Sequence, residues 1–344
     1  MVRIGKKWSI LTAGLLCASA LLVAVISPAA QASTSRLKTG LKAFVIPKNL
    51  GNNYFTTADS VKTGGALYAL KVLRDHGTET SGTADTPASQ LPAIDAAISK
   101  GAQILIVSAT DPTALCSTLN SAMKRGITVV TYDSDAPSCR DLYISQASAA
   151  EIGRSEVDIM AKEVHDTGQI AVVSASADDT NQNTWIRFMK LELKKFPKMK
   201  LVSVVYGNDD TATSTAVTQG LLSRYPKLEG IISPTTVGIA AAAAVLDVKA
   251  YRGKVHLTGL GTPDAMRKYV LDGTCPEFEL WNPANLGYLA AWAAVEFYSH
   301  AITNAKGQHF IAGKLGRFSV ESGHTILLGP PFVFDKGNIK KFNF

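Results

Sequence analysis

Polar and aromatic side chains recur directly after the short apolar runs of this 344-residue chain. The candidate site residues at these five places are Lys48, Asn49, Tyr54 and Phe55; Asp133 and Asp135; Asn181 and Gln182; Pro234 and Thr236; and Trp281 and Asn282. Amides, carboxylates and a lysine hydrogen-bond to hydroxyl groups, and aromatic faces cover the C–H faces of a sugar ring. Together these residues predict a site for a small polyhydroxylated molecule.

Each of these residues alone has a simpler explanation. An Asn or Asp after a strand is commonly a turn residue or a helix N-cap. A single lysine such as Lys48 is usually a solvated charge, and Tyr54 and Phe55 could be core residues at the start of a helix. The prediction therefore depends on the same chemistry recurring at five strand ends.

Catalytic motifs find little support in the sequence. It contains no G-x-S-x-G, P-loop or H-E-x-x-H pattern, and its six histidines are scattered without metal-ligand spacing. The segment 259–264 (GLGTPD) begins like a dinucleotide fingerprint but lacks the third glycine. Asp133 and Asp135 could form a glycosidase pair, but on one loop we expect one to contact ligand and the other to be structural. We predict a non-enzymatic protein without cofactor or metal.

The elements that carry these residues alternate between strand and helix along the chain. Apolar runs predict strands over 41–46, 103–107, 127–132, 169–174, 201–206, 230–233 and 255–260. Helical patterns lie between them, including 58–76, 112–125, 147–165, 182–196 and 284–301. Unalternating apolar strands joined by helices predict parallel sheets covered on both faces. The fold class is α/β, doubly wound, and this many strands favour two sheets in two lobes.

The N-terminus has the form of a secretory signal. Arg3, Lys6 and Lys7 precede an apolar run over 10–26, and Ala30-Gln31-Ala32 follows a Ser-Pro breaker. A small-x-small sequence of this kind predicts cleavage after Ala32, so that 1–32 is a signal peptide. An uncleaved membrane anchor is the alternative, because the run approaches a spanning length. The predicted location is the periplasm or extracytoplasmic cell envelope.

Composition indicates a globular protein with a sizeable core. Apolar residues make up 46% and charged residues 18% of the chain. The formal charge of +7 includes three basic residues of the leader, and +4 remains without them. Five lysines between 190 and 200 cluster where a helix would expose them, which favours a solvated face over a nucleic-acid surface. We predict no nucleic-acid partner.

Three cysteines follow the predicted signal peptide. They form no C-x-x-C pair, and an oxidising compartment permits a disulfide. Cys116 lies early in a helical pattern and Cys139 just past the next strand, so the two could be close enough to bridge. The sequence leaves open whether Cys116 and Cys139 are bridged or free. If they are bridged, Cys275 has no partner and we expect it to be a buried thiol.

Several long segments resemble the type I periplasmic sugar-binding proteins of the ribose-binding group. They are FVIPKNLGNNYF (44–55), VSATDPTALC (107–116), TYDSDAPSCRDLYISQ (131–146), TNQNTW (180–185), SPTTVGIAAAAAV (233–245), GLGTPDAMRKYV (259–270), LWNPANLGYLAAWA (280–293) and LLGPPFVFDKGNI (327–339). The resemblance implies a monomeric, extracytoplasmic receptor that closes two lobes around a sugar and passes it to the permease subunits of an ABC transporter.

The resemblance also implies how the chain divides between the lobes. We expect one lobe to comprise 40–147 and 262–281, and the other 148–261 and 282–344, with three chain crossings between them. Trp281 and Asn282 would lie at a crossing, and the helix 284–301 would pack on the second lobe.

Within that group the chain is most similar to rhamnose-binding proteins and autoinducer-2 receptors. Lys48, Asp133, Gln182 and Pro234 match the autoinducer-2 pattern, whereas Asn181 and Thr236 replace its Asp and Ala. The segments 280–283 and 328–332 resemble the rhamnose type. A deoxyhexose is therefore the favoured ligand, with autoinducer-2 as the alternative. A sugar-acting envelope enzyme is a more remote alternative, and a LacI-type regulator would need a DNA-binding segment where the signal peptide lies.

Overall fold

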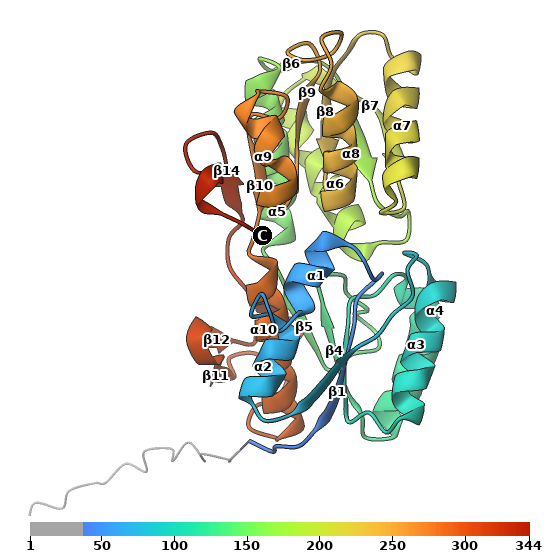
Figure 1. Cartoon of the computed structure of the whole chain (residues 1–344), viewed down its shortest axis with the longest axis vertical. Helices are drawn as coiled ribbons and strands as arrows, with labels where there is room; N and C mark the ends of the chain where they lie inside the picture. Colours follow the sequence, from blue (N-terminus) through green and yellow to red (C-terminus); the bar gives the residue numbers. More distant parts are fainter. Residues whose placement is uncertain (1–36) are drawn as a thin grey trace, which may run out of the picture. The chain divides into compact units, whose positions relative to one another are not determined.

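The computed structural model describes residues 37–344, which form two parallel sheets covered by helices. The α/β fold class predicted from the sequence is confirmed (Figure 1). The predicted signal peptide over 1–32 lies outside the described residues.

The first lobe contains a six-stranded sheet in the order β13-β5-β4-β3-β1-β2, with all neighbours parallel. Its strands are β1 (Lys42–Ile46), β2 (His76–Glu79), β3 (Ile104–Val107), β4 (Thr128–Tyr132), β5 (Leu142–Ser145) and β13 (Thr325–Leu327). Its helices are α1 (Asn53–Asp59), α2 (Ala66–Val72), α3 (Pro87–Ser99), α4 (Pro112–Lys124) and α10 (Pro283–Tyr298).

The second lobe contains a four-stranded parallel sheet in the order β7-β6-β8-β9. Its strands are β6 (Thr167–Ser174), β7 (Lys198–Tyr206), β8 (Leu228–Ser233) and β9 (His256–Gly259). Its helices are α5 (Ala149–Glu163), α6 (Thr180–Glu192), α7 (Thr211–Arg224), α8 (Thr236–Leu246) and α9 (Pro263–Leu271). Short antiparallel pairs join β10 (Phe278–Leu280) to β14 (Phe332–Phe334) and β11 (His309–Ile311) to β12 (Arg317–Ser319).

Local sequence explains where these elements begin and end. Every residue of β3 and β4 is buried, as expected for strands covered on both faces. Helix α4 begins after Asp111, whose carboxylate accepts from the backbone N–H of Thr113 at 2.7 Å, and Pro112 occupies the first turn. These local signals set the bounds of the strands and helices. Because the strands of each sheet are parallel, their carboxyl ends lie at one edge of that sheet.

The helix predicted over 58–76 is wrong, because the structure divides it into α1 and α2. Gly64 has a φ of +82°, a conformation that favours glycine. A Cβ on Gly65 would lie 2.0 Å from the carbonyl oxygen of Ala58, so the chain turns closely here. The strand β2 begins at His76, where the helix was expected to end.

The predicted assignment of 262–281 to the first lobe and of the helix 284–301 to the second lobe is also wrong. Helix α9 packs on α8, and β10 lies beside β9, so 262–281 belongs to the second lobe. Helix α10 instead packs on α1, α2 and the first sheet (Figure 1). Strand β13 pairs with β5 of the first sheet. The chain then returns to the second lobe at β14. A Cβ on Gly287 would lie 1.9 Å from the carbonyl oxygen of Ala58, which shows how closely α10 approaches α1.

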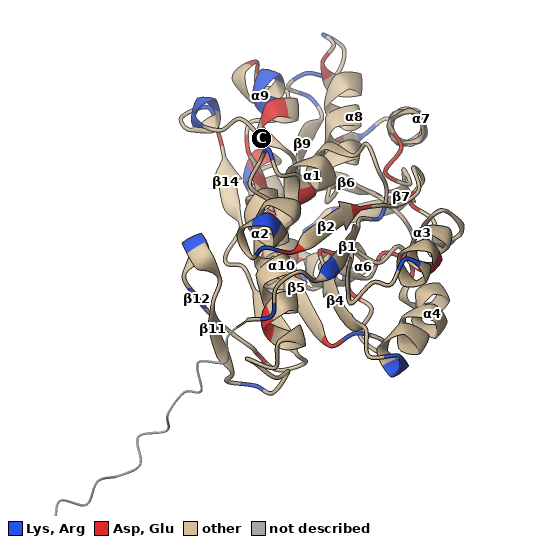
Figure 2. Ribbon diagram, turned by 60° about the horizontal axis from the view of Figure 1, so that its bottom comes forward, with Lys and Arg blue, Asp and Glu red and all other residues tan. Residues whose placement is uncertain are grey.

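The lysines between 190 and 200 are solvent-exposed, as the sequence predicted. Lys195 forms an ion pair with the buried Glu192 carboxylate, and Arg154 approaches the same carboxylate at 3.5 Å. Figure 2 shows Lys and Arg interspersed with Asp and Glu along the ribbon.

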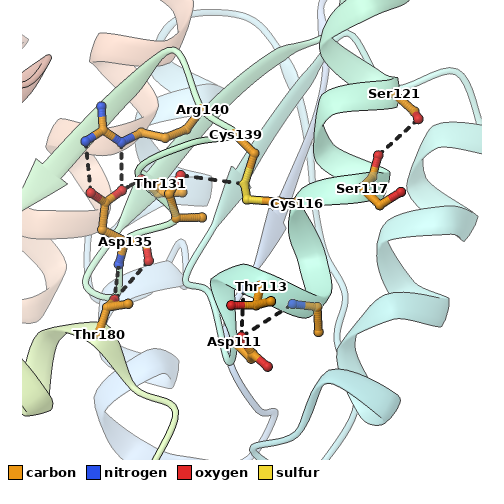
Figure 3. Close-up of a disulfide and its surroundings, with 12 residues drawn as sticks. Asp111, Thr113, Cys116, Ser117, Ser121, Thr131, Asp135, Cys139, Arg140 and Thr180 are labelled. Atoms are coloured by element: carbon orange, nitrogen blue, oxygen red, sulfur yellow. Dashed lines mark hydrogen bonds and ion pairs between the residues drawn. A yellow bond between two sulfur atoms is a disulfide. The ribbon is translucent and has the colours of Figure 1, made fainter.

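A disulfide joins Cys116 of α4 to Cys139, which follows β4 (Figure 3). It closes a loop between cysteines 23 positions apart, and that loop includes Asp133 and Asp135. Cys275 is a buried free thiol whose pKa is raised by burial.

Replacing Cys116 and Cys139 together by serine should lower the free energy of unfolding by about 3 kcal/mol, because a loop of this length is constrained in the unfolded chain. Urea unfolding of the wild type and the double variant measures the difference. Dithiothreitol should destabilise the wild type and leave the double variant unchanged. Equal urea midpoints for the oxidised wild type and the double variant would contradict the expectation.

Candidate functional site

The carboxyl ends of strands from both sheets border one cavity. About 340 Å³ of space in and around it, part of it open solvent, is not filled by protein atoms. Its lining consists of Lys48, Asn52, Tyr54, Phe55 and Asp133 from the first lobe, Asn181, Gln182, Trp185, Asp209, Pro234, Thr235, Thr236, Leu260 and Leu280 from the second, and Trp281 at the crossing. In parallel α/β sheets this edge is where ligands bind.

Most residues predicted from the sequence lie in this lining. They are Lys48, Tyr54, Phe55, Asp133, Asn181, Gln182, Pro234, Thr236 and Trp281. They come from loops up to 233 positions apart in the chain, as Lys48 and Trp281 show. The two sheets bring them together because each residue lies in the loop or the start of the helix that follows a strand.

Three predicted residues do not line the cavity. Asp135 is held by Arg140, whose Nε and Nη2 lie 2.7 and 2.9 Å from its carboxylate (Figure 3). Asn282 is the N-cap of α10 and accepts from the backbone N–H of Asn285. Asn49 is buried, but it borders a neighbouring groove instead. Asp135 and Asn282 thus have structural roles, as an ion-pair partner and as a helix N-cap.

Six lining residues were not among those predicted. They are Asn52, Trp185, Asp209, Thr235, Leu260 and Leu280. Asp209 follows β7, so the rule used at the other strand ends would have found it. Leu260 and Leu280 carry no polar signal, and only the tertiary structure shows that they face the cavity.

A buried ion pair connects the two lobes at the cavity. Lys48 Nζ lies 2.8 Å from Asp179 Oδ2, and the side chains are 2% and 0% exposed. Burial lowers the pKa of Lys48, but Asp179 and the neighbouring Asp85, Asp133 and Asp209 outweigh burial and raise it. Burial raises the pKa of Asp179 to about 6, against the opposing effect of Lys48. Lys48 therefore stays charged, with further donor hydrogens for a ligand.

Asp133 supplies the first lobe's carboxylate in the cavity lining, and Asp209 supplies another from the second lobe. It has a φ of +60°, which Asp tolerates better than most residues, and this turns its side chain off the end of β4. Ser108 Oγ donates to Oδ2 at 2.9 Å, and Asn181 Nδ2 of the second lobe donates to Oδ1 at 3.4 Å. Burial raises the pKa of Asp133, and Lys48 lowers it.

Gln182 is oriented by its own lobe. Its Oε1 accepts from Ser174 Oγ at 2.6 Å and from the backbone N–H of Ala175 at 2.8 Å. The amide oxygen is thus occupied, which leaves the amide nitrogen as a donor in the cavity lining.

Aromatic and leucine side chains form the apolar part of the cavity lining, which we call the apolar wall. Trp281 lies between two aromatic neighbours, with ring centroids 6.2 Å from Tyr54 and 6.1 Å from Trp185. The indole Nε1 of Trp281 donates to Tyr54 Oη at 2.8 Å, so its polar atom is satisfied. Leu260 and Leu280 extend the wall. Such a surface suits C–H faces or a methyl group.

The N-terminus of α6 holds the lobes together. Besides the Lys48–Asp179 and Asp133–Asn181 contacts, Thr180 Oγ1 donates to the carbonyl of Asp135 at 2.9 Å (Figure 3). The same hydroxyl accepts from the backbone N–H of Asp135 at 3.2 Å. Three consecutive residues, 179–181, thus contact the first lobe beside the cavity, which defines a closed arrangement of the lobes.

Among residues 37–344 no cluster of His, Cys, Asp and Glu is arranged to hold a metal ion. In the same part of the chain, none of the helices has both the length and the apolar character needed to span a bilayer.

Residues 43–300 match the model of the periplasmic binding protein domain. The chain belongs to the periplasmic binding protein family. The resemblance inferred from the sequence is thereby confirmed at the level of the family, whose members bind solutes and do not transform them.

Solved structures agree with this family. An ABC transporter solute-binding protein from Clostridium phytofermentas, with bound L-rhamnose, is 32% identical; the alignment covers 89% of this binding protein and 98% of that chain, with a TM-score of 0.85. A sugar ABC transporter protein from Actinomyces odontolyticus is 39% identical over 88% of this chain and 98% of that chain, with a TM-score of 0.69.

A more distant structure shares the fold. LsrB from Clostridium saccharobutylicum, in complex with AI-2, is 22% identical, covers 88% of this binding protein and 100% of that chain, and has a TM-score of 0.81.

Replacing Asp85 by Asn should stabilise this binding protein at pH 8 and have little effect near pH 4. Burial raises the pKa of Asp85 to about 8, against the opposing effect of Lys48, and its carboxylate oxygens have no hydrogen-bond partner among the described residues. From about pH 4 upward the unfolded chain releases this proton while the folded chain keeps it, so stability falls as pH rises toward 8.

Thermal unfolding at both pH values measures the effect. Each kcal/mol gained should raise Tm by about 1.5 °C, because the unfolding entropy grows with chain length. Asp95→Asn, on exposed α3 surface, is the matched control. A gain at pH 4 as large as that at pH 8 would contradict the assigned titration.

Proposed function

We propose that this protein captures L-rhamnose, or a closely related 6-deoxyhexose, outside the cytoplasm and delivers it to the permease of an ABC importer. The observation that carries the proposal is the mixed lining of the cavity, in which Lys48, Asp133 and Gln182 occur together with aromatic and leucine side chains. A 6-deoxyhexose suits such a lining, because it offers hydroxyls to the polar groups and a methyl group to the apolar ones.

The relatives support this ligand class. The L-rhamnose-bound protein from Clostridium phytofermentas is related over most of the chain. The family works outside the cytoplasm, which agrees with the secretory signal predicted over 1–32.

The cavity also gives a reason to prefer a sugar over autoinducer-2. Asn181 donates to Asp133 at 3.4 Å, and an Asp at position 181 would place a second buried carboxylate against the first. The Asn removes that repulsion and one negative charge from the cavity. Thr236 adds a hydroxyl where the autoinducer-2 pattern has Ala. These two differences alter the charge and the hydrogen bonding offered to a ligand.

Ligand capture follows from closure of the two lobes. A sugar bridging Asp133 of the first lobe and Gln182 of the second has more contacts in the closed state than in the open state. Ligand binding therefore shifts the population toward the closed state. The permease would recognise the closed form.

Isothermal titration with a panel of ligands tests the proposed specificity. L-Rhamnose should bind about ten- to a hundredfold more tightly than L-mannose, because the apolar wall must desolvate the extra hydroxyl at carbon 6. Autoinducer-2 should bind more weakly than L-rhamnose. Tighter binding of autoinducer-2 than of any 6-deoxyhexose in the panel would replace the proposed function with the alternative one.

Replacing Asp133 by Asn should weaken L-rhamnose binding by about ten- to a hundredfold, because a charge-assisted hydrogen bond is lost while the side-chain shape is kept. Asn also tolerates the positive φ at this position. Asp178→Asn, an exposed carboxylate outside the lining, is the control. Titration calorimetry measures both, and unchanged affinity in the Asp133 variant would exclude this residue from the site.

A further inference from the structure

Asp209 contributes a carboxylate to the cavity lining from the loop between β7 and α7. The backbone N–H of Asn208 donates to the carbonyl of Ala175 at 2.9 Å, and the residue before it donates to the carbonyl of Ser174 at 2.8 Å. These two bonds tie the loop to the end of β6. The loop therefore presents Asp209 to the cavity in a fixed position.

The backbone of this loop adopts an unfavourable conformation. Asn208 and Asp209 have φ values of +54° and +47°. Residues with a side chain seldom adopt this left-handed conformation, although Asn and Asp tolerate it better than most. It persists where the surrounding structure enforces it, and such positions concentrate at functional sites. Here the second of the two residues is the one that lines the cavity.

Thr235 orients the Asp209 side chain instead of capping a helix. It is the N-cap residue of α8, yet its side chain accepts no hydrogen bond from the first turn of that helix. Its Oγ1 donates to Asp209 Oδ1. A threonine at an N-cap usually stabilises its own helix through its hydroxyl. Helix α8 lacks that stabilisation, and the hydroxyl holds a carboxylate of the cavity lining in place.

The second oxygen of this carboxylate is available to a ligand. Thr235 is the one hydrogen-bond partner that residues 37–344 give the Asp209 side chain, and it occupies only Oδ1. Asp209 is half-buried, and its Oδ2 keeps contact with solvent. A molecule in the cavity can therefore reach Oδ2. Because a carboxylate only accepts hydrogen bonds, the ligand group that pairs with it must be a donor such as a hydroxyl.

The neighbouring carboxylates favour a neutral donor. Burial raises the pKa values of Asp133 and Asp179, and the negative charge of Asp209 raises both further, whereas Lys48 lowers them. The three carboxylates thus repel one another. An anionic ligand group would add to this repulsion, but a hydroxyl donates a hydrogen bond without adding charge.

We propose that Asp209 is a specificity-determining residue, whose Oδ2 accepts a hydrogen bond from one hydroxyl of the bound 6-deoxyhexose. This contact makes the protein select sugars that carry a hydroxyl at that one ring position. The inference rests on the proposed function, since it concerns the same ligand in the same cavity. It adds a carboxylate contact from the second lobe, and the residues that match the autoinducer-2 pattern do not include Asp209.

Calorimetric titration of the wild type and of Asp209→Gly tests the inference. The ligands are L-rhamnose and its four monodeoxy derivatives, which lack the hydroxyl at carbon 1, 2, 3 or 4. Glycine deletes the carboxylate and adopts a positive φ without strain. For one derivative, the missing hydroxyl should weaken binding to the wild type by about tenfold or more and binding to Asp209→Gly by less than about threefold. The other three should lose the same factor in both proteins, because only groups in contact are coupled.

Asp209→Asn provides a second variant that keeps the shape of the side chain and tolerates the positive φ. It should weaken L-rhamnose binding by about tenfold, because the hydrogen bond loses its charge. Asp210→Asn is the matched control, since it removes the same charge from the next residue, which lies outside the cavity lining. Asn remains a good N-cap for α7, so this control should change the affinity less than about twofold. Thermal unfolding shows whether each variant retains the fold.

The outcomes separate this inference from the proposed function. If every deoxy derivative loses the same factor with the wild type and with Asp209→Gly, Asp209 contacts no hydroxyl and only the inference fails. If Asp209→Asn binds L-rhamnose like the wild type, or if Asp210→Asn weakens binding equally, the inference is likewise overturned. If the wild type binds neither L-rhamnose nor any other 6-deoxyhexose, the proposed function fails and the inference fails with it.

Discussion

The buried ion pair between Lys48 and Asp179 is the interaction on which the closed cavity depends. Its partners belong to different lobes, and both are almost fully removed from water. Taking two charges out of water costs several kcal/mol per ion unless they pair with good geometry. The pair is therefore favourable only when the lobes meet, and in the open state each group is better solvated. Because the cost of desolvating both charges offsets much of their attraction, closure requires further contacts between the lobes.

The start of α6 couples those contacts to the ligand site. Residues 179–181 contact the first lobe, and Asn181 also lines the cavity beside Gln182. Movement of α6 toward the first lobe thus brings ligand-binding groups and lobe-joining groups into place together. The disulfide constrains the opposing loop, which carries Asp133 and Asp135. A constrained loop loses less conformational freedom when the lobes close.

The carboxylates around Lys48 share one positive charge, and their pKa values depend on it. Burial raises the pKa values of Asp85, Asp133 and Asp179, and a single lysine opposes the effect at all three. Every further carboxylate in this region therefore adds repulsion that Lys48 does not fully offset. The amide of Asn181 lies within this region, where it satisfies Asp133 without adding charge.

The sequence by itself determined the class of fold and the loops that build the site, because apolar runs mark buried strands and parallel strands place their following residues at one edge. Lys48, Asp133 and Gln182 were predictable on that basis, and Asp209 would have been by the same rule. Local sequence could not separate Asp133 from Asp135, since Arg140 decides which of them is an ion-pair partner. It also could not assign α10 to a lobe, because a helix with apolar residues on every side can pack on either sheet. Only the tertiary structure decided these points, through contacts between residues far apart in the chain, such as Gly287 against Ala58.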